Sequence, residues 1–128
     1  QPEEHKEEQD TYEQFLVKKD VQFIEKIHQV IEENLDNSDF NIDTIASTIG
    51  LSRSAFFKKL KSLTGFAPVD LVKEIRLNKS IELIKNSDMS ISEIAFAVGF
   101  KDSGYFSKCF RKKYDQTPRE YMNEWRKG

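Results

Sequence analysis

The amino-acid sequence predicts an all-α fold in which two helix-turn-helix subdomains are joined by a long connector helix. The first observation is an internal repeat, because residues 41–65 recur as a degenerate copy at residues 90–115. The second is the segment between the copies, where apolar side chains recur at helical spacing from Pro68 to about Lys85. Proline suits the first position of a helix. A helix of this length, roughly 27 Å at about 1.5 Å per residue, is a rigid connector that touches both subdomains.

Each copy of the repeat opens with a short predicted helix. Its apolar residues recur at i, i+3 and i+7, and they are Ile42, Ile45 and Ile49 in the first copy and Ile91, Ile94 and Val98 in the second. Asn41 is the expected cap of the first of these helices, and Ser90 with Glu93 forms a capping box at the other. Gly50 and Gly99 follow at matching positions, where glycine ends a helix in a left-handed conformation without steric cost. We therefore expect the chain to turn at both glycines.

A second helix follows each turn, with a buried stripe at helical spacing. The stripes are Phe56, Leu60 and Leu63 in the first copy and Phe106 and Phe110 in the second. Ser52 is the expected cap of the first of these helices. Two short helices joined by a glycine-containing turn form a helix-turn-helix, whose second helix normally enters the major groove of DNA. The repeat thus predicts two reading helices.

Charge is divided unevenly along the chain. The net charge is −2, but residues 1–49 carry 4 Lys/Arg and 13 Asp/Glu, whereas residues 50–128 carry 16 and 9. The two reading helices contain basic side chains and no acidic one, namely Arg53, Lys58, Lys59 and Lys61 in the first and Lys108, Arg111, Lys112 and Lys113 in the second. A solvated helix face usually mixes both signs to gain i,i+4 pairs. Binding of a polyanion is therefore the favoured interpretation.

The motifs of both copies resemble a known family. The first copy reads IAxxIGLSRSxFxKKLKxLTGxxP and the second reads IAxxVGFKDxxYFSKCFRKKYxxTPxEY. From Asp20 to Trp125 the chain resembles the DNA-binding domain of the AraC/XylS family of bacterial transcription regulators. The resemblance implies a seven-helix, homeodomain-like fold and sequence-specific binding of double-stranded DNA. The acidic start of the chain and the stretch EENLDNSDF also resemble the effector ends of bacterial hybrid two-component regulators.

On the first reading helix, the residues opposite the buried stripe are the candidates for DNA contact. They are Arg53, Ser54, Phe57, Lys58 and Lys61. Lys58 is a candidate for guanine O6 and N7, whereas Arg53 and Lys61 are expected to hold phosphates. Phe57 has two interpretations of equal weight, contact with a thymine methyl group or extra packing beside its buried neighbour. The family resemblance implies base contacts at Ser54, Phe57 and Lys58.

On the second reading helix, the matching arc contains Ser103, Gly104, Ser107 and Lys108, flanked by Tyr105, Arg111 and Lys112. The family resemblance implies base contacts at the first four. Gly104 has no side chain with which to contact a base edge. We therefore expect mainly phosphate contacts from this subdomain. As direct repeats in one chain, the two subdomains should occupy successive major grooves about 34 Å apart. The duplex must bend if the connector holds them closer than straight DNA allows.

The predicted boundaries are a partly disordered linker at residues 1–19, a first subdomain at 20–66, the connector at 67–88 and a second subdomain at 89–128. For residues 12–19, extension of the first helix and docking onto an upstream domain both remain open. The first helix is expected from Asp20 to about Leu35, with an acidic face directed away from DNA. A capping box at Thr117 starts the last helix, in which Tyr121 and Trp125 are expected to seal the core. Stacking of Trp125 on a base is the weaker alternative.

Other classes of function have little support in the sequence. We expect no enzymatic activity, cofactor or metal, because the chain has two distant histidines, no phosphate-binding glycine-rich loop, no metal-ligand cluster and no nucleophile elbow. The single cysteine, Cys109, is interpreted as a half-buried hydrophobe rather than a redox sensor. A helical protein-interaction module without DNA binding is the main alternative, and it would require apolar exposed arcs.

The expected partners are promoter or operator DNA, RNA polymerase and an upstream receiver or sensor domain. No apolar run approaches the roughly 18 residues of a membrane span. We therefore expect no membrane contact by this domain and a cytoplasmic location, including the case of a cytoplasmic end of a membrane-anchored regulator.

Overall fold

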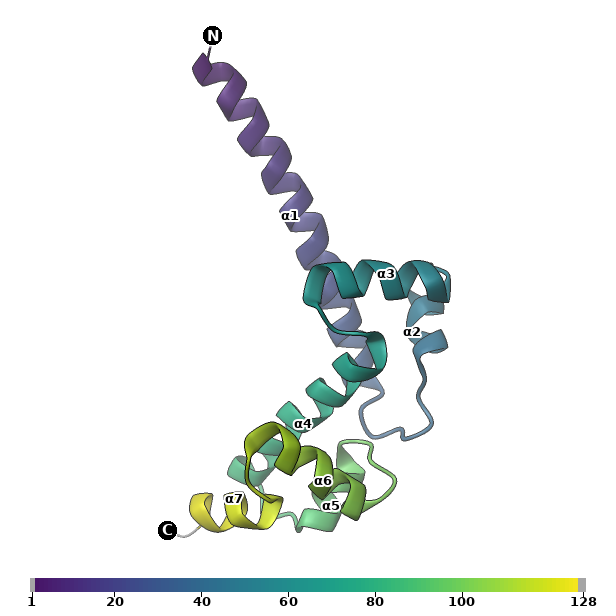
Figure 1. The fold of residues 1–128 in the computed structure, drawn as a ribbon, viewed down its shortest axis with the longest axis vertical. Coiled ribbons are helices and arrows are strands. Elements are labelled where there is room, and N and C mark those ends of the chain that lie inside the picture. Colours follow the sequence, from purple (N-terminus) through teal and green to yellow (C-terminus); the bar gives the residue numbers. More distant parts are fainter. Residues whose placement is uncertain (1, 127–128) are drawn as a thin grey trace.

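The computed structural model describes residues 2–126, and within this range the chain forms seven helices and no strand (Figure 1). The helices are α1 (Pro2–Glu33), α2 (Ile42–Thr48), α3 (Arg53–Thr64), α4 (Pro68–Asn86), α5 (Ile91–Ala97), α6 (Ser103–Tyr114) and α7 (Pro118–Trp125). Helices α2 and α3 form one helix-turn-helix, α5 and α6 form the other, and α4 runs between them. The predicted all-α fold with two helix-turn-helix subdomains is confirmed.

Helix α1 is longer than the sequence analysis predicted. It runs without interruption from Pro2 to Glu33, which corrects the expected helix start at Asp20. Residues 2–19, the described part of the expected linker, are helical, and residue 1 lies outside the described chain. Glutamate, lysine and glutamine are good helix formers and no glycine or proline follows Pro2 in this segment, so local propensity favours a helix even without an apolar period. The amino-terminal part of α1 projects away from the two subdomains (Figure 1).

The first subdomain packs α1, α2 and α3 around one apolar core. Its most deeply buried side chains are Ile27, Ile31, Ile45, Phe56 and Leu60. Leu63, predicted as the third member of the α3 stripe, instead keeps 39% of its surface exposed. It lies in the last turn of α3, where the chain turns away at Gly65 with a φ of +79°. The prediction of a buried Leu63 is therefore wrong.

The second subdomain is built on a chain of aromatic contacts. Phe106 and Phe110 are fully buried with ring centroids 5.8 Å apart, and Phe110 lies 5.8 Å from the ring of Tyr121 in α7. Tyr121 thus closes this core as predicted. Trp125 does not, because it is 53% exposed and lies over Tyr121, with a centroid distance of 6.0 Å. It also contacts Lys85 of α4, whose Nζ lies 4.1 Å from the indole centroid, so Trp125 covers the edge of the core.

The predicted helix caps are present. Asn41, Ser52, Ser90 and Thr117 each accept a hydrogen bond from the backbone amide three residues later. Glu93 and Glu120 complete two capping boxes by accepting a hydrogen bond from the amide of the cap residue. These hydrogen bonds lower the pKa of both carboxyl groups, because they favour the charged form. The starts of these four helices are therefore determined by local sequence.

Connector helix α4 is buried on more than one side, as its apolar pattern predicted. Its 19 residues span roughly 28 Å at about 1.5 Å per residue. The guanidinium of Arg126 holds its carboxyl end, with Nε donating to the carbonyl of Ile84 at 2.9 Å. The Tyr114 hydroxyl of α6 donates to Asn78 of α4 at 3.1 Å, and burial raises the pKa of Tyr114 to about 12. The connector is thus attached to the second subdomain along much of its length.

Candidate nucleic-acid interface

Helix α3 turns a basic face to solvent. Its five predicted contact residues, Arg53, Ser54, Phe57, Lys58 and Lys61, are all exposed. On the opposite side Phe56 and Leu60 are completely buried, and no acidic residue occurs anywhere in the helix. Phe57 keeps 47% of its surface exposed, so about half of this aromatic side chain lies open to solvent.

Two of these cations already have partners within the protein. Arg53 lies beside Asp43 of α2, with 3.6 Å between Nη1 and Oδ1. The Nζ of Lys61 donates to the carbonyl of Gly65 at 2.9 Å, where a cation is favoured by the negative end of the helix dipole. Both side chains must leave these partners to bind a phosphate, whereas Lys58 has no such internal contact among the described residues.

Helix α6 presents a similar face. Gly104, Tyr105, Lys108, Arg111 and Lys112 are exposed, whereas Ser103 and Ser107 are half-buried. Asp102, which the sequence analysis did not single out, caps this helix by accepting a hydrogen bond from the amide of Gly104 at 2.7 Å. A Cβ at residue 104 would lie 3.1 Å from the same carboxylate oxygen. Glycine at this reading position therefore leaves room for the cap.

One cation of the basic run in α6 faces the connector instead of solvent. Lys113 forms an ion pair with Glu74 of α4, and its Nζ donates to the Oδ1 of Asn78 at 2.6 Å. The side chain of Lys113 is 22% exposed. This contact joins α6 to the connector, so the ammonium of Lys113 is not directed at an outside partner.

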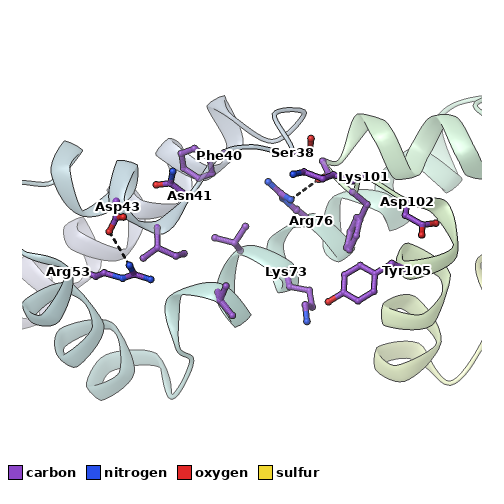
Figure 2. A pocket seen from close by; sticks show the side chains of 15 residues that line it. Ser38, Phe40, Asn41, Asp43, Arg53, Lys73, Arg76, Lys101, Asp102 and Tyr105 are labelled. Atoms are coloured by element: carbon purple, nitrogen blue, oxygen red, sulfur yellow. Dashed lines mark hydrogen bonds and ion pairs between the residues drawn. The ribbon is translucent and has the colours of Figure 1, made fainter.

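A cleft of about 510 Å³ is lined by residues of both subdomains and of the connector, and the amino ends of α3 and α6 both border it (Figure 2). Arg53 lines it from α3, and Asp102 and Tyr105 line it from the start of α6. Lys73 and Arg76 of α4 lie between them. The starts of α3 and α6 therefore share one open space.

The connector supplies cations to this cleft that the sequence analysis missed. The Nζ of Lys73 lies 5.7 Å from the ring centroid of Tyr105. Interaction with the Tyr105 side chain raises the pKa of Lys73. Val69, Lys73 and Arg76 are spaced as one helix face and all line the cleft. The i,i+3 spacing of the two cations was visible in the sequence, but it did not reveal which face of α4 is open.

Other candidate chemistry has little to support it in the described structure. Cys109 is half-buried and packs against the apolar core, as expected of a small hydrophobic side chain. Among residues 11–126, whose side chains the structure describes, no cluster of three His, Cys, Asp or Glu side chains could hold a metal ion. None of the described helices combines the length and the apolar character needed to cross a membrane.

The family resemblance is supported by comparison with known proteins. A family model of the AraC type, described as a helix-turn-helix domain, matches residues 45–124. The chain is 38% identical over 106 residues to the histidine kinase P4 of Formosa agariphila. This match covers 83% of the chain and 8% of that protein, so the chain spans less than a tenth of its relative.

Solved structures share the fold. One is the C-terminal domain of the two-component response regulator yesN from Fusobacterium nucleatum, with 31% identity, a TM-score of 0.70 and coverage of 77% of this chain and 95% of that chain. Another is the DNA-binding domain of the transcriptional factor AdpA in complex with a target DNA, with 28% identity, a TM-score of 0.74 and coverage of 82% and 93%. Sequence motifs, fold and family match agree. The chain therefore belongs to the AraC-type family of helix-turn-helix domains, which are DNA-binding domains of transcription regulators and not enzymes.

Proposed function

We propose that this chain is the sequence-reading output domain of a larger transcription regulator, and that α3 and α6 enter successive major grooves of one duplex. One observation carries the proposal. At equivalent positions of the repeat, two helices expose basic faces without an acidic side chain, and their amino ends border one cleft. Base readout in a major groove uses side chains near the amino end of such a helix. The likeness to the DNA-binding domain of AdpA, solved with a target DNA, supports DNA as the partner.

On α3, Ser54, Phe57 and Lys58 are the proposed base contacts. All three are exposed, and the half-exposed ring of Phe57 offers an apolar surface of the kind that a thymine methyl group contacts. Lys58 would donate to guanine O6 or N7. Arg53 and Lys61 are assigned to phosphates, which position the helix without specifying sequence.

On α6, the exposed residues favour phosphate contacts over base readout. Lys108 is the candidate for base contact, while Ser103 and Ser107 are half-buried and Gly104 has no side chain. The flanking residues Tyr105, Arg111 and Lys112 would hold the sugar-phosphate backbone. We therefore assign the stronger base discrimination to α3.

The acidic face of α1 supports this orientation on DNA. Glu25, Glu32 and Glu33 are exposed, and a phosphate backbone repels such a face. The duplex would then approach the reading helices from the side away from these carboxylates. Electrostatic orientation of this kind also accelerates association.

The relatives suggest the wider context. The chain matches a small part of a histidine kinase and resembles the C-terminal domain of a response regulator. We infer that an upstream signalling domain controls this output domain, and that contact with RNA polymerase converts DNA binding into a change in transcription.

Selection of duplexes from a random pool tests the proposal. Wild type should enrich a site made of two blocks about 10 base pairs apart, because successive major grooves on one face are one turn apart. Lys58→Met should relax base preference in one block, and Lys108→Met should relax it more weakly in the other. Lys79→Met removes a charge from α4 beside Glu82 and serves as the control that leaves both blocks intact.

Two outcomes would contradict the proposal. The first is that wild type enriches no duplex at low salt. The second is that both reading-helix variants relax the same block, because a single groove would then contain both contacts. Retention of partner proteins with salt-insensitive affinity and no DNA binding would favour a helical interaction module instead.

A further inference from the structure

Arg76 joins the two subdomains through one side chain. Its Nη1 donates to the carbonyl of Gly99 at 2.7 Å, and its Nη2 donates to the carbonyl of Asn37 at 3.2 Å. Gly99 lies in the turn between α5 and α6, whereas Asn37 lies in the loop between α1 and α2. A guanidinium on the connector thus holds one carbonyl from each helix-turn-helix subdomain, at the centre of the cleft in Figure 2.

The two subdomains are in close contact at this point. A Cβ at Gly99 would lie 2.2 Å from the carbonyl oxygen of Leu35 and 2.7 Å from Cζ of Arg76. Gly50 occupies the same position in the first copy with a similar positive φ, yet a Cβ there would meet nothing within 4 Å. Glycine therefore suits the turn in both copies, but in the second copy it also allows the subdomains to meet.

An ion pair also crosses this contact between the two subdomains, which we call the seam. Lys101 lies 3.0 Å from Asp39, measured from Nζ to Oδ1, but both side chains are well exposed and such pairs contribute little. Arg76 is different, because its planar fork directs two donors in a fixed geometry. Its half-burial lowers the pKa of the guanidinium, and no hydrogen-bond partner for its Nε is found in the described part of the chain. The two carbonyl contacts are thus what holds this side chain in the seam.

We propose that Arg76 is a positioning residue, which sets the distance and angle between α3 and α6 and thereby the spacing of the two half-sites that the domain accepts. This inference rests on the proposed function. One base pair changes the separation of two half-sites by about 3.4 Å and their relative rotation by about 35°. When two DNA-binding modules are linked, the affinity of the pair increases only if the length of the link matches the distance between the two half-sites.

The first test measures the geometry without DNA. Spin labels are attached at Ser47→Cys in α2 and Asn123→Cys in α7, which are both exposed, in a Cys109→Ser background. The distance distribution between the labels should be narrow in this parent and clearly broader after Arg76→Met. Lys79→Met removes the same charge from the same helix outside the cleft, so it should leave the distribution narrow.

A glycine pair provides a second perturbation in case Arg76→Met lowers stability too far. Gly99→Ala places a methyl group in the seam and should shift the label distance, whereas Gly50→Ala has a similar backbone strain without the collision and should not. The inference would be overturned if Arg76→Met showed the same distance distribution as the parent. If Arg76→Met is too unstable to measure, the same result for Gly99→Ala would overturn it.

The second test varies the spacing on DNA. Starting from the selected site, one base pair is inserted or removed between the two blocks. The parent should prefer its own spacing by roughly tenfold or more, and Arg76→Met should reduce this preference severalfold while Lys79→Met retains it. An unchanged spacing preference in Arg76→Met also overturns the inference. Failure of wild type to bind any duplex would instead overturn the proposed function, and the label distances would still report on the seam.

Discussion

Arg53 and Asp43 form an ion pair at the edge of the cleft, with the Arg53 Nη1 3.6 Å from the Asp43 Oδ1. Their side chains are 71% and 65% exposed, so the pair is weak. Arg53 is the first residue of α3, and Asp43 lies in the first turn of α2. The cation that we propose for a DNA phosphate is therefore paired with an acid of the neighbouring helix, and a bound phosphate would compete with that acid.

Asp43→Asn should strengthen binding to all duplexes. Because an exposed pair contributes about 0.5 to 1 kcal/mol, freeing Arg53 should raise affinity roughly two- to fivefold. Fluorescence anisotropy with a selected and a scrambled duplex would measure both gains. Glu25→Gln makes the same charge change on α1, away from the proposed interface, and should have a much smaller effect. An equal gain in both variants would mean that net charge, and not the ion pair, limits binding.

Arg111→Met should lower the affinity for all DNA duplexes about equally. Arg111 is exposed on α6 and is assigned to a phosphate. Its loss should reduce the slope of log affinity against log salt by about one, without changing the selected bases. Lys113→Met is the matched control, because the ammonium of Lys113 is bound to Glu74 and Asn78; it should lower thermal stability and leave the salt slope unchanged. A change in base preference in Arg111→Met would contradict the phosphate assignment.

Leu60→Ala and Leu63→Ala should lower the free energy of unfolding by clearly different amounts. Leu60 is completely buried, so its truncation should lower the free energy of unfolding by about 2 to 5 kcal/mol. Leu63 is 39% exposed, and its truncation should cost roughly 1 kcal/mol or less. Urea unfolding monitored by circular dichroism measures both values. Equal costs would indicate that Leu63 is covered in solution, as the sequence pattern predicted.

Glu93 and Glu120 should make folding sensitive to acid. Their pKa values are lowered from 4.5 in the folded chain by the capping hydrogen bonds, so the unfolded chain binds their protons more readily. The stability they contribute is complete above the ordinary pKa and is lost as the pH falls through the folded value. The double variant Glu93→Gln with Glu120→Gln keeps an amide that can complete both boxes but does not titrate.

Urea unfolding between about pH 6 and pH 3 would measure this effect, because stability lost over this range follows the protons taken up on unfolding. The double variant should lose less stability than wild type over the range. Glu124→Gln, an exposed α7 residue outside both capping boxes, should follow wild type. If the stability of the double variant fell with pH as steeply as that of wild type, the carboxylates of Glu93 and Glu120 would be ruled out as the source of the acid sensitivity.

Local patterns predicted the helix-turn-helix units well because the interactions that define them are local. A cap such as Ser52 bonds an amide three residues away, and a turn such as the one at Gly50 depends on the φ of one residue. The apolar period identified Phe56 and Phe106 as core residues for the same reason. The apolar period did not reveal residues 11–19 of α1 as helical, since a helix exposed on most sides needs no apolar face to form.

The duplication, the capped starts of α2, α3, α5 and α7, and the basic faces of α3 and α6 could be derived from the amino-acid sequence alone. Tertiary structure decided which basic side chains are already bound, as Lys113 is to Glu74, 39 residues away. It also decided that Arg76 joins two carbonyls 23 and 39 residues away. A helical period specifies which residues share a face, but the elements that pack against that face come from distant parts of the chain.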